Sequence, residues 1–260
     1  VSAGHLFQNL KKKNPNLKIH PLDSEHYSLL SNIDEINNED YNKIILTASG
    51  GPFFNKKNIN FKNIKFKDAI KHPMWQMGYK NSIDSATLAN KCLEIIEAHY
   101  LFSIPFEKLD ILIHPQSLIH SIVEKNNFNT SLNYFYPDMF IPIFNFFNDN
   151  NSIKKNKNLK KKFKYKSQTL TFDKVNIHEF PVYKIFKKIN KQNPKNFIKF
   201  NCANQMAVEL FKNGKISYIK IPKFINKAMK LSSNYPVNTI KNVIKFQDNF
   251  NLKLNSFYEK

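Results

Sequence analysis

A dense run of polar side chains follows Trp75, the only tryptophan of the chain. It comprises Ser82, Asp84, Ser85, Thr87, Asn90, Lys91 and Glu94. In a helix beginning near Ser85, helical spacing puts Thr87, Asn90, Lys91 and Glu94 on one face. Asp84 or Ser82 can cap the start of this helix, where free backbone N–H groups also favour an anion. Such a stripe suits a phosphorylated, metal-chelating substrate, and an ordinary solvated helix face is the alternative.

A pair of acidic residues, Asp23 and Glu25, follows a predicted strand. Residues two apart in a strand point to the same side. Together with Glu94 they predict a cluster of three carboxylates, which suits a hard cation such as Mg²⁺ or Mn²⁺. A helix cap is the alternative for the pair. Zinc is disfavoured because the chain has no Cys/His spacing typical of a zinc site.

Three further features can contribute to a site. Ser49-Gly50-Gly51 follows the apolar run Ile44–Thr47 and reads either as a backbone cradle for a phosphate or as a tight turn. His72 lies in a loop that also carries Trp75, which predicts an aromatic lid. His120 either supports the site or is a hydrogen-bonded histidine of the core.

The elements that position these residues can be predicted from apolar spacing and turn residues. We expect helices at 2–12, 26–30, 85–102, 181–189, 201–213, 221–231 and 237–245. We expect strands at 17–22, 44–47, 109–114 and 119–124. Asn213-Gly214 marks the end of one helix.

Composition sets the class of protein. The chain has 260 residues, of which 42% are hydrophobic, and two cysteines, Cys92 and Cys202. This predicts a soluble cytoplasmic protein with a substantial core and no disulfide framework. The formal charge of +20 raises the possibility of nucleic-acid binding. All forty basic residues are lysine, and the absence of arginine, the residue best suited to forked phosphate and base contacts, argues against that role.

Six motifs occur in one order along the chain: DSEH (23–26), SGGPF (49–53), HPxWxMGxK (72–80), SxDSATxxNKxLExIEA (82–98), LIHPQSxIHS (112–121) and PDM (137–139). In this order and spacing the chain resembles the 1-deoxy-D-xylulose 5-phosphate reductoisomerases. The resemblance extends to FNCANQMAVELF (200–211), where the family carries a similar NAANE run.

The resemblance implies a role for each matching residue. Asp23, Glu25 and Glu94 would hold the metal, and Glu25, Glu94 and His72 would be catalytic. The same resemblance assigns substrate contacts to Ser24, Glu25, Ser49, His72, Trp75, Ser85, Asn90, Lys91 and Glu94. Met77 and Gly78 would lie near the nicotinamide of NADPH.

The resemblance also implies the reaction. A metal-dependent rearrangement of 1-deoxy-D-xylulose 5-phosphate would precede NADPH-dependent reduction to 2-C-methyl-D-erythritol 4-phosphate, in the methylerythritol phosphate route to isoprenoid precursors. The cofactors would be NADPH and Mg²⁺ or Mn²⁺, and the partner a second copy of the chain in a homodimer. Neither nucleic acid nor a membrane is an expected partner.

For the fold, we expect an α+β chain that combines a catalytic unit, built on a small mixed sheet, with a helical domain. Residues 1–22 would be the remnant of a Rossmann-like NADPH-binding domain, 23–150 the catalytic domain with a lid loop at 71–80, 151–172 a linker, and 173–260 a C-terminal helical domain.

Several departures from the family pattern qualify this expectation. No glycine-rich dinucleotide turn occurs in the sequence, so we expect a fragment of a longer enzyme with little NADPH turnover by itself. Phe135 and Phe140 replace the usual Gly and Arg around PDM, and Cys202 and Gln205 depart from NAANE. The alternatives are a sugar-phosphate isomerase that needs no nicotinamide and, outside enzymes, a basic nucleic-acid-binding protein.

Overall fold

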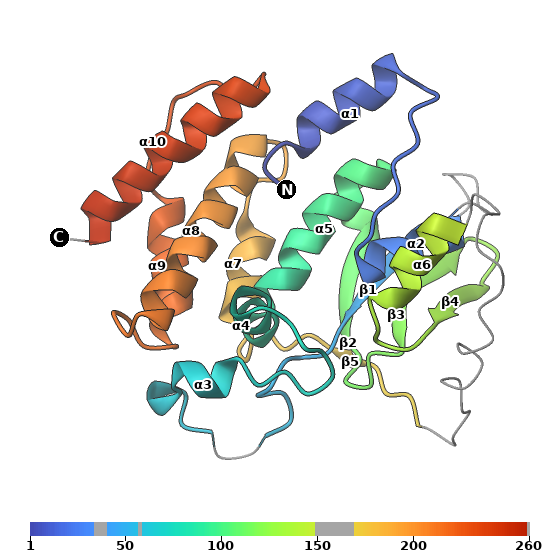
Figure 1. Ribbon diagram of the computed structural model, residues 1–260, viewed down its shortest axis with the longest axis horizontal. Coiled ribbons are helices and arrows are strands. Elements are labelled where there is room, and N and C mark those ends of the chain that lie inside the picture. Colours follow the sequence, from blue (N-terminus) through green and yellow to red (C-terminus); the bar gives the residue numbers. More distant parts are fainter. Residues whose placement is uncertain (34–40, 57–58, 149–168, 259–260) are drawn as a thin grey trace.

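The computed structural model describes residues 1–33, 41–56, 59–148 and 169–258. Within these ranges a mixed sheet lies beside a group of helices (Figure 1). The expected α+β class is therefore confirmed in its coarse form, a small mixed sheet combined with helices. Of the predicted linker, 151–168 lies outside the described residues, and 169–172 is exposed.

The sheet has five strands in the order β4-β3-β1-β2-β5. Their bounds are β1 Tyr41–Ala48, β2 Leu109–Ile113, β3 Ile119–Lys125, β4 Thr130–Tyr134 and β5 Asp173–Lys174. Only β1 and β2 are parallel. Ile44, Ile45 and Leu46 are all buried, as expected for a central strand covered on both faces. The strands predicted at 44–47, 109–114 and 119–124 are thus confirmed.

The helices of the first part of the chain are α1 Gly4–Lys13, α2 Ser24–Ile33, α3 Phe66–Ala69, α4 Tyr79–Thr87, α5 Ala89–Phe102 and α6 Phe140–Asn148. Two short 3₁₀ turns, η1 and η2, occupy Phe61–Asn63 and Phe106–Lys108. Helix α2 packs on β3 and β4, α5 packs on β1 and β2, and α1 packs on α5. The predicted helices at 2–12 and 26–30 are confirmed by α1 and α2.

The prediction of a strand at 17–22 is wrong, because this segment joins α1 to α2 and is not part of the sheet. A strand needs a neighbouring strand for its hydrogen bonds, and Pro21 has no N–H to donate. The acidic pair that follows is consequently at the start of a helix, not at the end of a strand.

The later helices are α7 Pro181–Lys188, α8 Pro194–Lys212, α9 Lys220–Met229 and α10 Ile240–Tyr258, and they confirm all four helices predicted in this region. Proline at the first turn of α7 and α8 suits a helix start, and Asn193 caps α8 by accepting from the Lys195 N–H. One hydrophobic cluster includes side chains from β1, α5, α8 and α10. The core is therefore continuous between the sheet and the later helices.

The first residues of the chain contact its last helices. The His5 ring nitrogen Nε2 lies 2.6 Å from the Val237 carbonyl oxygen. The Ser2 hydroxyl accepts hydrogen bonds from the side-chain amides of Asn201 and Gln247. Helix α1 is thus held between α5 and the C-terminal part of the chain.

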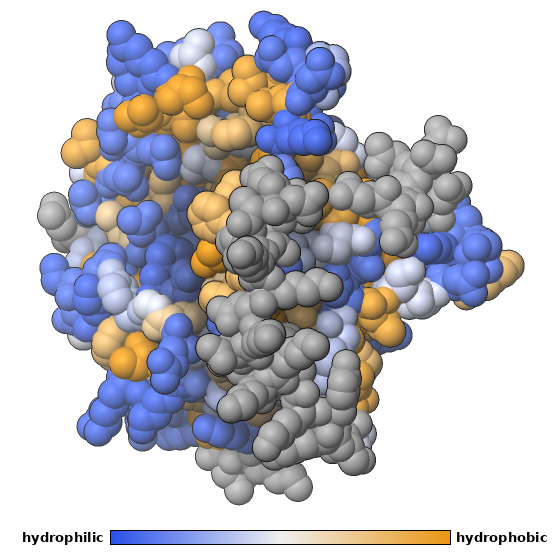
Figure 2. All heavy atoms as spheres, turned by 45° about the vertical axis from the view of Figure 1, so that its right-hand side comes forward, coloured by the Kyte–Doolittle hydropathy of each residue, from blue (hydrophilic) through white to orange (hydrophobic). Residues whose placement is uncertain are grey.

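The surface is mainly hydrophilic on the face shown in Figure 2, with separate hydrophobic patches. Among the described residues, none of the helices combines the length and the apolar content that crossing a membrane requires.

Candidate functional site

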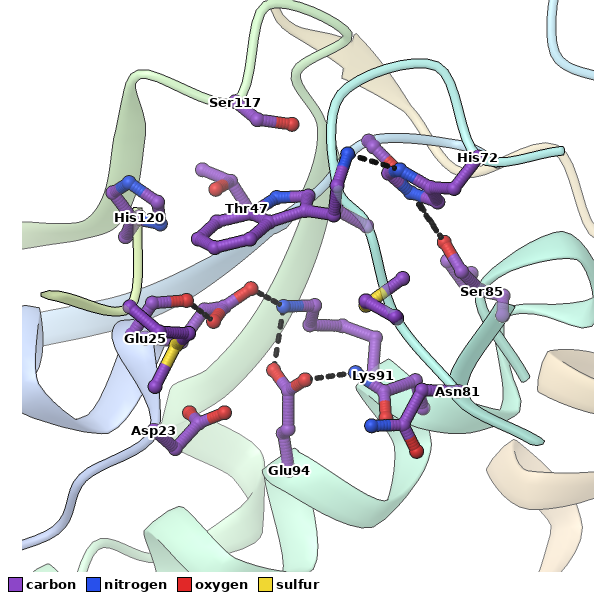
Figure 3. A pocket seen from close by; sticks show the side chains of 18 of the residues that line it. Asp23, Glu25, Thr47, His72, Asn81, Ser85, Lys91, Glu94, Ser117 and His120 are labelled. Atoms are coloured by element: carbon purple, nitrogen blue, oxygen red, sulfur yellow. Dashed lines mark hydrogen bonds and ion pairs between the residues drawn. The ribbon is translucent and has the colours of Figure 1, made fainter. Parts of the chain in front are cut away.

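A cavity of about 280 Å³ opens at the carboxyl end of β1 (Figure 3). The starts of α2, α4 and α5, the loop before α4 and the β2–β3 connection all contribute to its wall. The lining residues are Asp23, Ser24, Glu25, Thr47, Ala48, Ser49, His72, Trp75, Gln76, Met77, Asn81, Ser85, Leu88, Asn90, Lys91, Glu94, Ser117, His120 and Met139.

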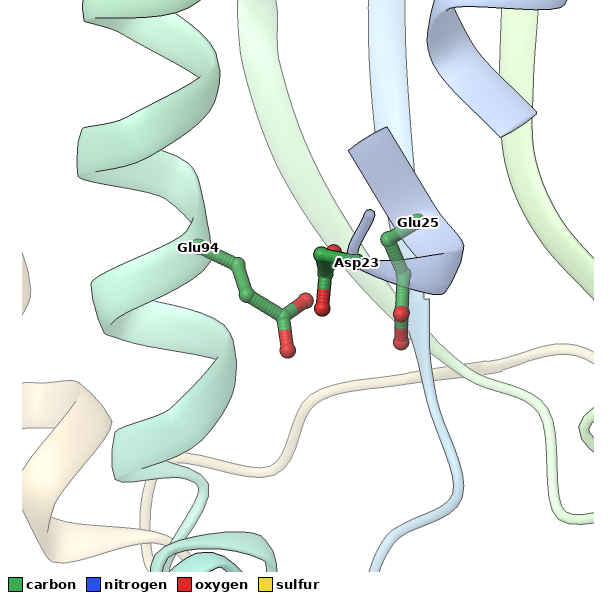
Figure 4. A group of neighbouring side chains, drawn as sticks. All are labelled: Asp23, Glu25 and Glu94. Atoms are coloured by element: carbon green, nitrogen blue, oxygen red, sulfur yellow. The ribbon is translucent and has the colours of Figure 1, made fainter. Parts of the chain in front are cut away.

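Three carboxylates meet on one side of this cavity (Figure 4). One oxygen from each of Asp23, Glu25 and Glu94 lies within 4.8 Å of the other two. Asp23 immediately precedes α2 and accepts from the His26 N–H at 3.2 Å, which caps the helix, while Glu25 is in its first turn. The acidic residues predicted to converge do so, but a helix start orients them and not the pleat of a strand.

Lys91 lies between two of these acids. Its ammonium donates to Glu25 and to Glu94, and both Lys91 and Glu94 are buried. Burial lowers the pKa of a lysine, but the adjacent carboxylates of Glu25 and Glu94 outweigh it and raise the pKa of Lys91. For Glu94, burial and the nearby Glu25 raise the pKa well above its ordinary value. One ammonium therefore does not fully compensate this group of acids.

His26 contacts two of the acidic residues and is completely buried. Its Nδ1 lies 2.7 Å from a carboxylate oxygen of Asp23, and its Nε2 donates to the Glu94 backbone carbonyl at 2.9 Å. Burial opposes protonation, yet Asp23 raises the pKa of His26 to about 9. The imidazolium thus connects α2 to α5 and orients two of the three acids.

A second polar cluster occupies the other side of the cavity. His72 Nε2 lies 2.8 Å from the Ser49 hydroxyl and 3.1 Å from the Ser85 hydroxyl. His72 Nδ1 accepts from the backbone N–H groups of Met74 and Trp75. Because Nδ1 accepts twice, the neutral ring carries its proton on Nε2 and donates toward the serines. Burial lowers the pKa of His72 to about 4, which keeps this form at neutral pH.

The two glycines after Ser49 allow β1 to approach α4 closely. Both have a left-handed backbone, with φ of 82° at Gly50 and 71° at Gly51. A Cβ added to Gly51 would lie 2.7 Å from the Ala86 Cα. Ser49 and Ser85 can therefore meet only because this turn has no side chain at Gly51.

The helix predicted at 85–102 is instead two helices, α4 and α5. Leu88 separates them with a left-handed φ of 63°, a conformation that costs roughly 1–2 kcal/mol in a non-glycine residue. Ser82 and Asp84 are inside α4 and buried, so the prediction that either caps the helix is wrong. Thr87 bonds the backbone of α4 and does not line the cavity, unlike Asn90, Lys91 and Glu94.

The loop before α4 covers part of the cavity. Trp75 and Met77 line it, and the Trp75 ring meets His120 edge-on with centroids 6.1 Å apart. Gly78 begins α4 and does not line the cavity. His120 is a buried histidine that stacks on Phe135 and has Nε2 3.3 Å from the Phe135 carbonyl oxygen, and it also lines the cavity.

Every residue to which the family resemblance assigns a role lines the cavity, except Gly78. The lining residues that the sequence did not single out are Thr47, Ala48, Gln76, Asn81, Leu88, Ser117 and Met139. Ser117 and Met139 are specified positions of the motifs quoted above, and that was the available signal for them. The other five stand at unspecified motif positions or outside the motifs. Of the four departures from the family pattern, Phe135 and Cys202 are buried and Phe140 and Gln205 are exposed.

The donor set fits a hard divalent cation. Carboxylate oxygens are the preferred ligands of Mg²⁺ and Mn²⁺, and a divalent cation would add positive charge to a group of three carboxylates that has Lys91 and His26 as its cationic neighbours. The hydroxyls and the Nε2–H across the cavity fit the oxygens of a phosphate.

Two family models match the chain. The C-terminal domain of 1-deoxy-D-xylulose 5-phosphate reductoisomerase matches residues 19–102, and the DXP reductoisomerase C-terminal domain matches residues 136–251. A 1-deoxy-D-xylulose 5-phosphate reductoisomerase of Malacoplasma penetrans is 37% identical over 250 residues, which are 96% of this chain and 64% of that protein. The enzyme of Acetivibrio thermocellus is 38% identical over 94% of this chain and 63% of its own length.

Solved structures agree with these matches. A crystal structure of DOX-P reductoisomerase in complex with NADPH, fosmidomycin and magnesium superposes with a TM-score of 0.87 and 28% identity, covering 99% of this chain and 67% of that one. The reductoisomerase from Zymomonas mobilis in complex with NADPH gives 0.82 and 29%, covering 100% of this chain and 66% of that one. By its family models, relatives and fold, the chain belongs to the 1-deoxy-D-xylulose 5-phosphate reductoisomerase family.

Proposed function

We propose that this chain binds the metal and the phosphorylated substrate in a 1-deoxy-D-xylulose 5-phosphate reductoisomerase. The overall reaction would convert 1-deoxy-D-xylulose 5-phosphate to 2-C-methyl-D-erythritol 4-phosphate with NADPH. One observation carries the proposal: a carboxylate cluster and a hydroxyl–imidazole cluster face each other across one cavity of about 280 Å³. The chain spans about 64% of the length of the Malacoplasma penetrans relative, and the activity of a whole enzyme is part of this proposal.

The metal would be held by Asp23, Glu25 and Glu94. When bound, it would supply Lewis-acid polarisation of substrate oxygens. His26 fixes Asp23 by a charged contact and the Glu94 backbone by a hydrogen bond, so the carboxylates are oriented before a ligand arrives. Ser24, which donates to Glu25, completes this side of the site.

The phosphate would be bound across the cavity by Ser49, His72 and Ser85, together with the side chains of Asn90 and Lys91 at the start of α5. Because the pKa of His72 is about 4, its ring is neutral at neutral pH and its Nε2–H is an uncharged hydrogen-bond donor. Binding the phosphate away from the reacting carbons orients the substrate, which is how remote binding energy assists a reaction.

The loop before α4 would act as a lid. His72 accepts two of its backbone N–H groups, so a ligand that contacts His72 also restrains the loop. Trp75 would then exclude water from the substrate. Met77 and Gly78 would contact the nicotinamide. The hydride chemistry belongs to that cofactor, and we assign no step of it to a side chain of this chain.

Three broader features complete the proposal. Residues 1–22 would be the part of a Rossmann-like nucleotide-binding domain nearest to the site, and the divisions at 23–150 and 173–260 would separate the catalytic and helical parts. The protein would be cytoplasmic. It would form a homodimer, since β4 is an edge strand in the described sheet and its Leu132 is half exposed.

Calorimetric titration with fosmidomycin tests the proposed function. We expect the chain to bind it in the presence of Mg²⁺ or Mn²⁺ and to lose that binding in EDTA. Glu94→Gln should weaken it roughly 100-fold, because the variant loses a charged metal ligand. Glu97→Gln is the matched control, since Glu97 lies one turn further along α5, does not line the cavity and should leave binding unchanged. Tight metal-independent binding, or equal affinity in both variants, would contradict the proposal.

A further inference from the structure

Helix α4 carries part of the candidate phosphate site on one side and contacts α8 on the other. Ser85 and Asn81 line the cavity. Asp84 points away from the cavity and is completely buried, with its carboxylate bonded to Lys80 and to Asn204. Of these two adjacent residues, Ser85 therefore faces the cavity, and Asp84 faces the later helices.

Two side-chain hydrogen bonds connect α4 to α8. The Tyr79 hydroxyl donates to Glu209, and the Asn204 amide donates to Asp84 at 2.8 Å. Tyr79 and Asp84 are five residues apart on α4, and their partners Glu209 and Asn204 are five residues apart on α8 in the reverse order. The two hydrogen bonds therefore hold the helices antiparallel and in one register. Near the end of α4 the Tyr218 hydroxyl donates to the Ala86 carbonyl at 2.8 Å.

Helix α4 has nine residues, which is too few for a stable helix in isolation. Its orientation must come from its neighbours. On the site side, Gly51 lies against Ala86 without room for a Cβ. On the other side, the polar contacts to Asp84, Tyr79 and the Ala86 carbonyl come from residues 204–218.

The Asn204 side chain contributes less to the stability of the fold than an apolar side chain of similar size would. It is completely buried, and its Oδ1 has no hydrogen-bond partner among the described residues. A buried amide left half satisfied disfavours folding compared with a well-packed apolar side chain. What Asn204 adds is a directional bond to the neighbour of Ser85.

We propose that Asn204 is a positioning residue for the phosphate site: through Asp84 it fixes the rotation of α4, and thereby the place of the Ser85 hydroxyl against His72. This rests on the proposed function for the identity of the ligand, but the geometry of Ser85 and His72 can be measured without any ligand.

The first arm of the test is NMR of the His72 ring in the ligand-free chain. In Asn204→Ala we expect the His72 Nε2 resonance and its pKa, about 4 in the unmodified chain, to change because Ser85 moves. Asn201→Ala is the matched control. Asn201 lies one turn earlier on α8 and donates to Ser2 and not to α4, so the His72 signals should stay in place.

The second arm is calorimetry with fosmidomycin and, separately, with Mg²⁺. Asn204→Ala should weaken fosmidomycin roughly tenfold, as expected when a group that orients a ligand-binding side chain is lost, and leave Mg²⁺ affinity within about twofold. If the unmodified chain fails to bind fosmidomycin, the proposed function fails while the NMR arm still decides the role of Asn204.

Rescue separates positioning from general stability. Asn204→Asp places two carboxylates together and should disturb His72 as the alanine variant does. Adding Asp84→Asn to it restores an amide–carboxylate pair with its direction reversed. Because the exchange also removes the ion pair of Asp84 with Lys80, it should return the His72 signals and the affinity part of the way toward the original values. The proposal is overturned by unchanged His72 signals and affinity in Asn204→Ala, by failure of the reciprocal pair to rescue, or by failure of these variants to fold, which would assign Asn204 to stability alone.

Discussion

At the scale of single residues, the chemistry of the site depends on which charges are left uncompensated. Lys91 donates to two of the three carboxylates that we propose as metal ligands. The same ammonium is proposed to meet the substrate phosphate. A cation bound to the carboxylates would free the Lys91 ammonium for the phosphate, and a phosphate bound to Lys91 would free the carboxylates for the cation. Binding of the two ligands should be favourable to each other.

His72 gives a pH prediction at this scale. Burial lowers the pKa of the folded state to about 4, whereas an exposed histidine titrates near 6.5. Between these values the unfolded chain binds a proton that the folded chain does not, so this contribution to stability is complete above pH 6.5 and is lost as the pH falls toward 4. In His72→Gln the free energy of unfolding should decline less steeply across that window.

Urea denaturation at several pH values measures this difference. His178→Gln serves as the control, because His178 is exposed. Parallel pH profiles for the unmodified chain and His72→Gln would show that His72 titrates normally when folded.

Individual residues also show what the sequence could and could not predict. Asp23, Glu25 and Glu94 were expected to meet, and they do, although the reason given for the first two was wrong. The motif indicated which residues belong together, while their orientation depends on tertiary contacts such as that between His26 and the Glu94 carbonyl. Such contacts join residues far apart in the chain, and no local pattern reveals them.

At the scale of elements, the site depends on the close contact between the β1 turn and α4. Gly51→Ala should lower the free energy of unfolding by about 3 kcal/mol, because it adds a clash with Ala86 to an unfavourable left-handed backbone. Gly214→Ala is the matched control. Gly214 has a similar φ of 69° and open space around it, so only the backbone cost of about 1 kcal/mol applies.

Chemical denaturation of both variants tests this prediction. Equal losses of stability would mean that the contact with Ala86 adjusts without cost.

The break between α4 and α5 also belongs to the scale of elements, and no pattern in the sequence predicts it. Leu88 adopts a left-handed conformation that propensity alone disfavours, and its side chain is nearly completely buried in the core. Packing therefore decides the local backbone here.

At the scale of the whole molecule, most helices and the strands β1, β2 and β3 follow from apolar runs and spacing, because each buries a face in the core, whereas β4 was not predicted. Strand order was beyond sequence reasoning. The two residues of β5 pair with β2 although more than 50 positions separate them along the chain. Two residues are too few to show a periodic pattern of apolar side chains. The strand β5 forms because its backbone can hydrogen-bond to the free side of β2.

The exposed edge of β4 gives a prediction about assembly. Leu132→Lys should shift the proposed homodimer to monomer, since a charge on an edge strand opposes strand pairing. Light scattering coupled to size exclusion measures the mass. Leu252→Lys is the control, because Leu252 is equally apolar and more exposed but lies on α10. A dimer that survives Leu132→Lys would require a different interface.

The contact between His5 and Val237 has a consequence for how the protein is made. Translation proceeds from the N-terminus, so α1 leaves the ribosome long before Val237 is made. The packing of α1 on α5 can form earlier, but the contact of His5 with Val237 must wait until more than 200 further residues have been added. Closing so long a loop is slow compared with forming a local helix pair. The docking of α1 against the C-terminal part of the chain would therefore be among the last events of folding.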